Sequence, residues 1–427
     1  MKIFADFHIH SYLSRATSQN MNLDELSRNA KIKGLNLLGT GDFTHPIWMK
    51  ELKEKLEPID NSGLFTYNGI YWMITVEVST VYERKGKARK IHHVIHVPSF
   101  DIADQIIDSL SKRGDLSSDG RPIFNNLSSS ELVEILMSIY KDTLIIPSHA
   151  WTTWWSLFGA FSGFDSVEEC YEDMTKHIYA IETGLSSDPP MNWRLSKLDE
   201  FCLMSNSDAH SPWIWRLGRE FNAFDLKKPS YFEIVDAVKK RDKKRFTFTV
   251  EVPPEYGKYH YTGHRNCNVS LHPRDAIKLD NKCPKCGRKL TIGVLQRVEE
   301  LADRPEGFMP KNAIPYKSLL PLYEIISHAM EIDQLYSKKV MEEQDKLIAN
   351  FGNELNVLLN AKKNELLKVT SAKIADAIIK TREGRVEFIA GYDGVYGKPI
   401  FDTYKDENIE KRELHAQKEA KSLDDFI

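Results

Sequence analysis

The stretch Asp6-Phe7-His8-Ile9-His10 closes the first predicted strand, Lys2–Phe7, and is the part of the sequence that decides the fold. Side chains alternate between the two faces of a strand, so His8 and His10 point to the same side and can reach one cation. Two histidines at this spacing can equally be packed in a core. Residues elsewhere in the chain must therefore show whether the stretch belongs to a metal site.

Short β-branched runs alternate with amphipathic stretches from residue 1 to about 248. The order strand, helix, strand, helix predicts an α/β fold with a mostly parallel sheet or barrel. In such folds the catalytic groups gather at the C-terminal ends of the strands. Further strands are expected at Leu35–Thr40, Tyr71–Val78, Ile91–Pro98, Thr143–Pro147, Ile178–Glu182 and Phe201–Ser205, and helices at Leu23–Lys33, Ser129–Tyr140 and Tyr231–Lys240.

Side chains that bind metals recur at or just after these later strands. They outnumber the positions around a single ion, which favours a site for more than one metal. In the run His92-His93-Val94-Ile95-His96, alternation places His92 and His96 on the face opposite His93, and we favour the face that carries His93. The candidate ligands are Asp42, His45, Glu77, His93, His149, Asp208 and His210.

This pattern resembles the PHP (polymerase and histidinol phosphatase) family of metal-dependent phosphoesterases, which shares the D-x-H-x-H opening and a late S-D-A-H, here Ser207–His210. The resemblance implies a distorted (β/α)7 barrel that holds two or three divalent metals, often zinc, with Mg²⁺ or Mn²⁺ as alternatives. By position, His8, His10, Glu77 and Asp208 would hold one metal, Glu77, His93 and His149 a second, and His210 with Asp42 would approach a third.

One departure from the family concerns the segment Gly41-Asp42-Phe43-Thr44-His45, which stands where the family has T-D-H and leaves the role of His45 open. Paired metals can activate a water molecule, polarise a phosphoryl oxygen and stabilise the leaving oxygen. The predicted reaction is hydrolysis of a phosphodiester or phosphomonoester by a metal-activated hydroxide. Asp208, Glu77 and His149 are the candidate catalytic residues, and Asp208 is placed to steer the proton of the hydroxide.

A second cluster of metal-binding residues lies in His264-Arg265-Asn266-Cys267 and Cys283-Pro284-Lys285-Cys286, two pairs of equal spacing separated by 15 residues. The ligands His264, Cys267, Cys283 and Cys286 favour a closed, structural zinc site. His260 and His272 are alternatives to His264. The two remaining cysteines, Cys170 and Cys202, are expected in the core.

Charge is unevenly distributed along the 427-residue chain, whose net charge is −3. Residues 239–298 contain 15 basic and 5 acidic side chains, a net +10, so the remainder is acidic. A basic segment fixed by zinc can bind a phosphate backbone, although a solvated linker has the same composition. The candidate DNA contacts are Arg265, Lys285, Arg288 and Lys289.

Four longer strings, Gly39–Pro46, Gly263–Cys267, Gly293–Arg304 and Gly391–Gly397, are similar to the endonuclease Q family of DNA-repair nucleases, found mainly in archaea and some bacteria. The resemblance implies incision 5′ to deoxyuridine, deoxyinosine, deoxyxanthosine and abasic sites in double- or single-stranded DNA. It also implies four segments: a PHP barrel over residues 1–248, a basic zinc-binding domain over 249–298, a mainly helical C-terminal domain over 299–405, and a flexible tail over 406–427.

Two further features fit this resemblance. An enzyme that selects a damaged base must extrude it, and aromatic side chains can form the walls of the pocket that receives it. The candidates for this base pocket are Trp151, Trp154 and Trp155, which follow His149 closely. These tryptophans can equally pack the barrel against its neighbour. The C-terminal Leu423, Phe426 and Ile427 resemble a box that binds the PCNA sliding clamp, with Ala420 where glutamine is usual.

Two rival functions are a phosphatase acting on a small phosphomonoester and a non-catalytic zinc-ribbon scaffold. The phosphatase would not need the basic zinc segment, and the scaffold would lack metal ligands in its barrel. The N-terminal residues show no apolar leader, and no run approaches the ~18 apolar residues of a membrane span. We therefore expect a cytoplasmic protein that makes no membrane contact. The resemblance implies a nucleoid-associated enzyme of archaeal or bacterial type, and we expect a monomer because a duplex carries one asymmetric lesion.

Overall fold

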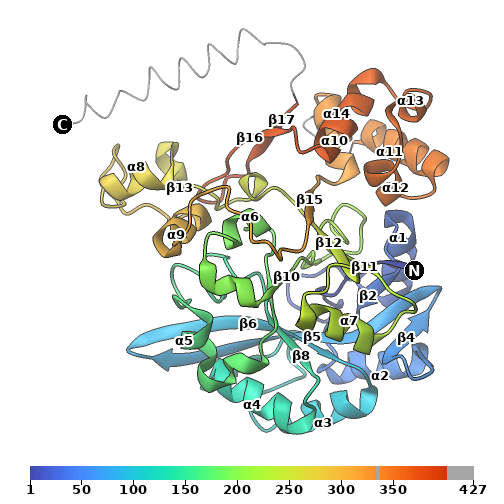
Figure 1. The fold of residues 1–427 in the computed structure, drawn as a ribbon, viewed down its shortest axis with the longest axis vertical. Coiled ribbons are helices and arrows are strands. Elements are labelled where there is room, and N and C mark those ends of the chain that lie inside the picture. Colours follow the sequence, from blue (N-terminus) through green and yellow to red (C-terminus); the bar gives the residue numbers. More distant parts are fainter. Residues whose placement is uncertain (333–336, 402–427) are drawn as a thin grey trace.

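The structure, a computed structural model, describes residues 1–332 and 337–401 (Figure 1). An α/β body forms the lower part of Figure 1. A small module around α8 and α9 and a group of helices from α10 to α14 lie above it on opposite sides. The expected α/β class with two appended parts is confirmed.

The main sheet of the described residues contains eleven strands, with the path β15-β12-β11-β1-β2-β5-β4-β3 and with β6, β7 and β8 attached at β5 and β6. A separate parallel pair joins β9 and β10. The bounds are β1 Lys2–Asp6, β2 Leu37–Gly39, β3 Glu57–Ile59, β4 Leu64–Tyr67, β5 Ile70–Arg84, β6 Lys87–Val97, β7 Ile123–Asn125, β8 Leu144–Pro147, β9 Ala180–Glu182, β10 Cys202–Met204, β11 Phe221–Asp225, β12 Phe246–Glu251 and β15 Tyr316–Ser318.

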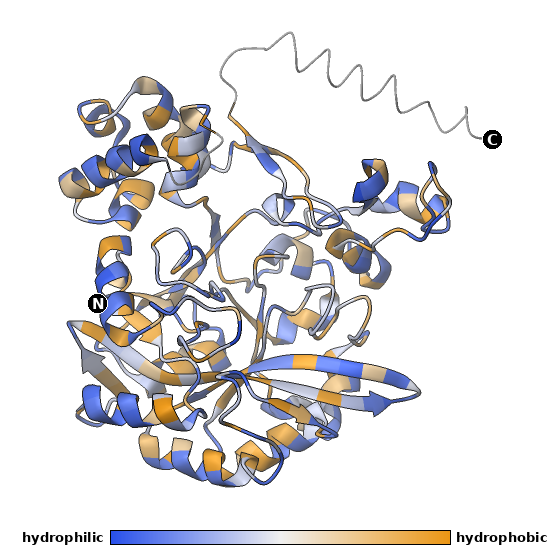
Figure 2. Cartoon of the chain, turned by 180° about the vertical axis from the view of Figure 1, so that it is seen from behind, coloured by the Kyte–Doolittle hydropathy of each residue, from blue (hydrophilic) through white to orange (hydrophobic). Residues whose placement is uncertain are grey.

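The sheet is mixed rather than mostly parallel, because β5 and β6 form one long antiparallel hairpin. Lys85 and Gly86 connect the two strands, and both have positive φ, of 53° and 70°. Two such residues in a row give the tight turn whose twist matches a hairpin. The hairpin projects from the body in Figure 2, with a hydrophilic tip.

Helices cover the sheet, and two of the three expected in this part, α1 (Leu23–Lys33) and α7 (Tyr231–Lys240), have the predicted bounds. Asn22 caps α1 by accepting a hydrogen bond from the backbone of Glu25. The others in the body are α2 Pro46–Lys55, α3 Phe100–Leu110, α4 Ser129–Ile139, α5 Val167–Tyr171 and α6 Pro189–Asn192.

Both faces of the sheet are buried. Leu37 and Met73 belong to one hydrophobic cluster, and their neighbours Leu38 and Ile74 to the other. The strands therefore read as nearly continuous apolar runs rather than as alternating ones. Cys170 and Cys202 are buried in these clusters, as expected.

The module after β12 is built from short elements: β13 Thr262–His264, β14 Val269–Leu271, α8 Pro273–Lys278 and α9 Val294–Leu301. The hairpin of β16 (Glu387–Ile389) and β17 (Lys398–Ile400) packs against it through the Gly391–Gly397 turn. Asp393 accepts hydrogen bonds from the backbone of Arg265 (2.7 Å) and the hydroxyl of Thr291 (2.7 Å).

The C-terminal part of the described chain is mainly helical, as expected, and is divided into short helices. Their bounds are α10 Leu322–Ala329, α11 Lys338–Phe351, α12 Glu354–Leu359, α13 Lys363–Leu366 and α14 Ala372–Arg382. The breaks fall at residues that start helices, because Asn353 and Ser371 cap α12 and α14 with their side chains. The expected clamp-binding box lies outside the described residues. No helix in the described part of the chain is long and apolar enough to cross a membrane.

Candidate metal centre

Three overlapping groups of metal-binding side chains come from β5, β6 and the segments that follow β1, β8 and β10. In each group the ligand atoms are within 4.8 Å of one another, and the groups share Glu77 and His10. The sharing matters because two metals act together in hydrolysis when they lie about 3.5–4 Å apart, and groups that share a ligand are close to each other. The groups are His8–His10–Glu77, Glu77–His92–His149 and His10–Asp208–His210.

Glu77, in the middle of β5, is the centre of the cluster and is fully buried. Its carboxylate lies 3.4 Å from Nε2 of His8, 3.0 Å from Nδ1 of His92 and 3.2 Å from Nε2 of His149. Burial alone would raise the pKa of Glu77, but the imidazoles of His92 and His8 beside it hold that pKa well below its usual range. The carboxylate is therefore ionised and suited to bridging two cations.

Asp208 is the second carboxylate in the cluster. Its Oδ1 lies 3.1 Å from Nε2 of His10 and 3.6 Å from Nε2 of His8. Burial would raise the pKa of Asp208, but the charge on His8 and the hydrogen bond from His10 hold it well below its usual range. The side chain is 30% exposed, so it faces the open side of the cluster.

Two further carboxylates hold the imidazoles from behind. Nδ1 of His8 lies 2.9 Å from Glu182, at the end of β9, and Nδ1 of His10 lies 3.2 Å from Asp42. A carboxylate that accepts from Nδ1 fixes the tautomer in which Nε2 carries the lone pair. Nε2 of His8 is buried and has no hydrogen-bond partner among the described residues, so the cluster fits a bound cation.

Three residues at or beside the cluster have an unfavourable backbone conformation. Asp42, His149 and Asp208 all have positive φ, of 50°, 30° and 48°, although none is glycine. Such angles cost of order 1–3 kcal/mol each and are retained where surrounding contacts impose them. At His149 those contacts include a hydrogen bond from its backbone N–H to Glu182 (3.1 Å).

The preference for His93 over His92 is wrong. Glu77 pairs with Val94 across the β5–β6 hairpin, which places His92 on the face of Glu77 and His93 on the opposite face. Both ring nitrogens of His93 are already bonded, to the hydroxyls of Tyr171 (2.9 Å) and Thr80 (3.1 Å).

Asp42 and His45 do not lie among the ligand groups either. Besides His10, Asp42 accepts hydrogen bonds from Ser11 and Ser14, so it supports a ligand and does not face the cluster. His45 caps α2: its Nδ1 accepts from the backbone of Ile47 (3.3 Å), and its Nε2 lies 3.0 Å from the carbonyl of Ser117. Its position just before Pro46 is typical of a helix cap.

The three candidate tryptophans have different surroundings. Trp151 is buried against Phe158 and donates to Asn192, so it is a core residue and not a pocket wall. The ring of Trp155 lies 5.2 Å from that of His92, beside the cluster. Trp154 is 44% exposed and stacks on the exposed Phe161.

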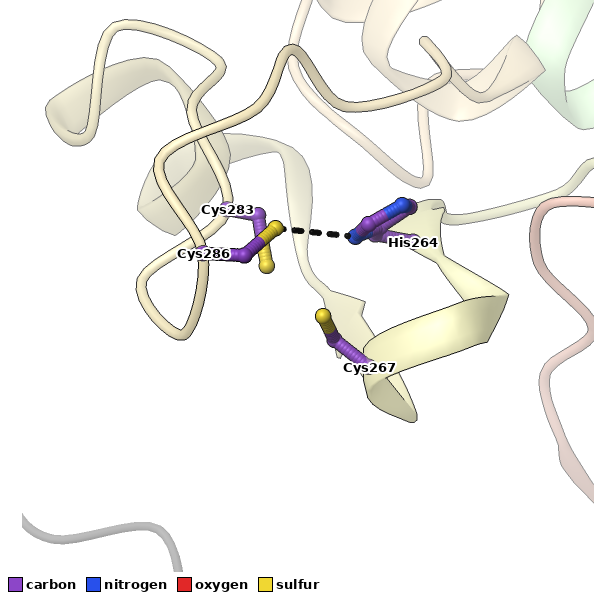
Figure 3. Close-up of side chains that lie close together, drawn as sticks. All are labelled: His264, Cys267, Cys283 and Cys286. Carbon is purple, nitrogen blue, oxygen red and sulfur yellow. Dashed lines mark hydrogen bonds between the residues drawn. The ribbon is translucent and has the colours of Figure 1, made fainter.

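The second predicted ligand set also comes together. Figure 3 shows His264, Cys267, Cys283 and Cys286 converging from the β13–β14 segment and the turn that precedes α9. Nδ1 of His264 lies 3.4 Å from Sγ of Cys286. The alternatives His260 and His272 are not in the group, and the donor set of one histidine and three cysteines fits tetrahedral zinc.

We call the part of the molecule around this candidate zinc site the zinc module. The four candidate DNA contacts on it are all exposed: Arg265, Lys285, Arg288 and Lys289. Two residues that the sequence did not single out approach the metal centre. Glu182 holds His8, and Arg121 places Nη1 3.3 Å from Glu77. The position of Glu182 at a strand end was an available indication, whereas Arg121 comes from a loop with no distinguishing pattern.

Comparison with known proteins covers nearly the whole chain. A crystal structure of the lesion-specific endonuclease PfuEndoQ from Pyrococcus furiosus has a TM-score of 0.85 and 34% identity, over 96% of this chain and 99% of that one. A structure of endonuclease Q in complex with a 27-mer duplex bearing an abasic lesion has a TM-score of 0.83 and 34% identity, over 96% and 100%.

Two sequence relatives are uncharacterized proteins. The uncharacterized protein YqxK of Bacillus subtilis is 30% identical over 93% of this chain and 99% of its own length. The uncharacterized protein MJ0043 of Methanocaldococcus jannaschii is 36% identical over 60% of this chain, which spans only 32% of that longer relative. The model of the MJ0043 C-terminal domain family matches residues 321–385, the C-terminal helices. With two solved structures alike over almost their full length, the chain belongs to the endonuclease Q family.

Proposed function

We propose that this protein is a metal-dependent DNA-repair endonuclease that hydrolyses the phosphodiester bond 5′ to a deaminated base or an abasic site. The nucleosides that carry these deaminated bases are deoxyuridine, deoxyinosine and deoxyxanthosine. The observation that carries the proposal is the cluster around Glu77 in a chain of which 96% matches endonuclease Q. One endonuclease Q structure contains a duplex with an abasic lesion, and this supports DNA as the substrate class.

When bound, divalent metals would activate water and polarise the phosphoryl oxygen. The residues that would hold them are His8, His10, Glu77, His92, His149, Asp208 and His210, with zinc, Mn²⁺ or Mg²⁺ as candidate ions. The shared position of Glu77 supports a bridging role. Asp208 faces the open side of the cluster, which supports its role in accepting the proton of the attacking water. Glu182 and Asp42 keep His8 and His10 in the tautomer that can bind metal.

Recognition of the lesion is assigned to aromatic side chains near the cluster. Trp155 beside His92 is the candidate wall of a pocket for an extruded base, and Trp154 with Phe161 offers an exposed surface on which a base can stack. Base–aromatic stacking is worth about 1–3 kcal/mol per base. Alanine at Trp154 or Trp155 should therefore weaken discrimination between uracil and thymine.

The zinc module is proposed to bind the DNA backbone through Arg265, Lys285, Arg288 and Lys289. Their exposure on a segment of net +10 supports this role. We propose three domains: a catalytic barrel over residues 1–248, a zinc-binding domain over 249–298 and a helical domain over 299–405. The clamp-binding role of Leu423, Phe426 and Ile427 in the tail over 406–427 is a proposal from sequence alone.

The decisive experiment uses the full-length protein with Zn²⁺, Mn²⁺ or Mg²⁺ and labelled duplexes carrying one dU, one dI, one abasic site or no lesion. A cut 5′ to the lesion, absent from the undamaged duplex, is the expected result. Asp208→Asn should abolish it, whereas the exposed Asp108→Asn should cut like the wild type. Hydrolysis of a small phosphomonoester without DNA cleavage would favour the phosphatase, and metal binding without either activity would favour the scaffold.

A further inference from the structure

Arg121 stands out because its guanidinium enters a cluster otherwise made of imidazoles and carboxylates. Nη1 donates to Oε2 of Glu77 at 3.3 Å, and the side chain is 25% exposed. Among the ion pairs of residues 1–332 and 337–401, this is the one that brings a lysine or arginine to a metal-group carboxylate. A cation beside a metal site needs a reason, since bound metals would already neutralise Glu77.

The loop that carries Arg121 is held on one side by the segment that follows His10 and on the other side by β5. Asp119 accepts hydrogen bonds from the backbone N–H groups of Arg121 and Arg15, both at 3.1 Å. Immediately after Arg121, the carbonyl of Pro122 accepts from Ser79 at 2.9 Å, and β7 pairs with β5, the strand of Glu77. The backbone of Arg121 is therefore anchored to the same strand that holds the central carboxylate.

Gly120 makes this close approach possible. A Cβ at Gly120 would lie 2.2 Å from Oδ2 of Asp42 and 2.5 Å from the hydroxyl of Ser14, so no other residue fits. Asp42 in turn holds His10. The loop thus packs behind His10, through Asp42, while Arg121 reaches Glu77. We infer that the loop holds the Arg121 side chain in a fixed position at the cluster.

The guanidinium of Arg121 also has donors that Glu77 does not use. The guanidinium has five N–H donors, and within the described residues the one contact recorded for it is that with Glu77. Its other donors are free to bind an anion beside the cluster.

We propose that Arg121 is a catalytic residue that binds the scissile phosphate by donating to a non-bridging oxygen. The planar fork of a guanidinium matches a phosphate, and an anion held between Arg121 and the metals would offset the repulsion between these cations. The bond strengthens as negative charge grows on the phosphoryl oxygens in the transition state. This role rests on the proposed nuclease function.

The first test compares full-length Arg121→Gln and Arg121→Lys with Arg113→Gln, an exposed arginine earlier in the chain. Metal content and melting temperature should be unchanged in all three. The single-turnover cutting rate should fall about 100-fold in Arg121→Gln, partly recover in Arg121→Lys and stay at the wild-type value in Arg113→Gln. Loss of metal in proportion to the rate would overturn the proposal, because Arg121 would then only support Glu77.

The second test removes the charge from the phosphate. A methylphosphonate at the linkage 5′ to the lesion should slow the wild type much more than Arg121→Gln, since the variant has already lost the contact. The same group one linkage away should slow both proteins equally. Equal slowing at the scissile linkage would show that Arg121 binds elsewhere and would overturn the proposal.

A third measurement separates this proposal from the nuclease function. If the wild type cut no lesion duplex, the proposed function would fail, but the metal-loaded protein could still be titrated with inorganic phosphate. Wild type should bind phosphate at least about tenfold more tightly than Arg121→Gln, the loss that one charge-assisted hydrogen bond represents. Equal phosphate affinities would overturn the role of Arg121 independently of any cleavage.

Discussion

Replacement of Glu182 tests whether the carboxylates behind the imidazoles prepare the metal centre. Glu182 accepts from Nδ1 of His8 at 2.9 Å and from the backbone of His149 at 3.1 Å, and it is almost fully buried. Glu182→Ala would leave both donors buried and unpaired, at about 1–3 kcal/mol each. Glu182→Gln keeps the shape but loses the charge, which is worth about 1 kcal/mol in such a bond.

These energies predict a graded loss of metal affinity, about tenfold for Glu182→Gln and about 100-fold for Glu182→Ala, in the range measured for carboxylates that orient metal-bound histidines. Titration with Mn²⁺ or Zn²⁺ against a competing chelator measures the affinity, and cutting at saturating metal separates binding from chemistry. Glu200→Gln, on the surface, is the matched control. Wild-type affinity in both Glu182 variants would refute the reasoning.

Three further perturbations test other parts of the molecule. Cys283→Ser should release one zinc ion and lower the melting temperature, whereas Lys285→Ser in the same turn should keep the zinc. Elemental analysis measures the zinc content and calorimetry the melting temperature. Zinc retained in Cys283→Ser would contradict the site. Burial raises the pKa of Glu251 from 4.5 to about 8, so between these pH values the folded chain keeps a proton that the unfolded chain loses. The free energy of unfolding should therefore fall as pH rises from 4.5 to about 8, and Glu251→Gln should flatten this fall. An unchanged slope in Glu251→Gln would contradict the prediction. Lys33→Met should lower the free energy of unfolding by about 3–5 kcal/mol, because it leaves Glu354 buried without the ammonium group that lies 2.8 Å away. Adding Glu354→Gln should recover part of that loss. If the losses of the two single variants simply add in the double variant, the two residues are not paired.

The sequence predicted the ligands that come from local patterns. His8 and His10 lie two residues apart just after β1, and the four candidate zinc ligands have the spacing of a zinc site, so alternation and counting were sufficient. The choice between His92 and His93 failed because it depends on which residue of β5 faces which residue of β6. The Lys85-Gly86 turn would have fixed that register, since a two-residue hairpin pairs Arg84 with Lys87 and therefore Glu77 with Val94.

Residues that act through the fold were harder to find. Glu182 reaches His8 across 174 positions of sequence, and Arg121 reaches Glu77 from a loop. Neither contact has a periodicity or spacing that a single sequence displays. His45 is the opposite case, because a histidine near metal ligands suggested a ligand, while the following proline indicated the helix cap that it forms.

The three parts of the molecule are joined by contacts that cross the expected domain boundaries. β15, from the segment after the zinc module, adds to the main sheet beside β12, and the Gly391–Gly397 turn returns to hold Arg265 through Asp393. Lys33 of α1 bonds both Glu354 and the carbonyl of Ile214, in the loop that follows His210. A duplex bound by the zinc module would therefore meet the metal centre in a fixed geometry, because the chain ties the module, the helices and the loop beside His210 to the same sheet. Loss of any of these ties should impair cutting of duplex DNA more than binding of metal.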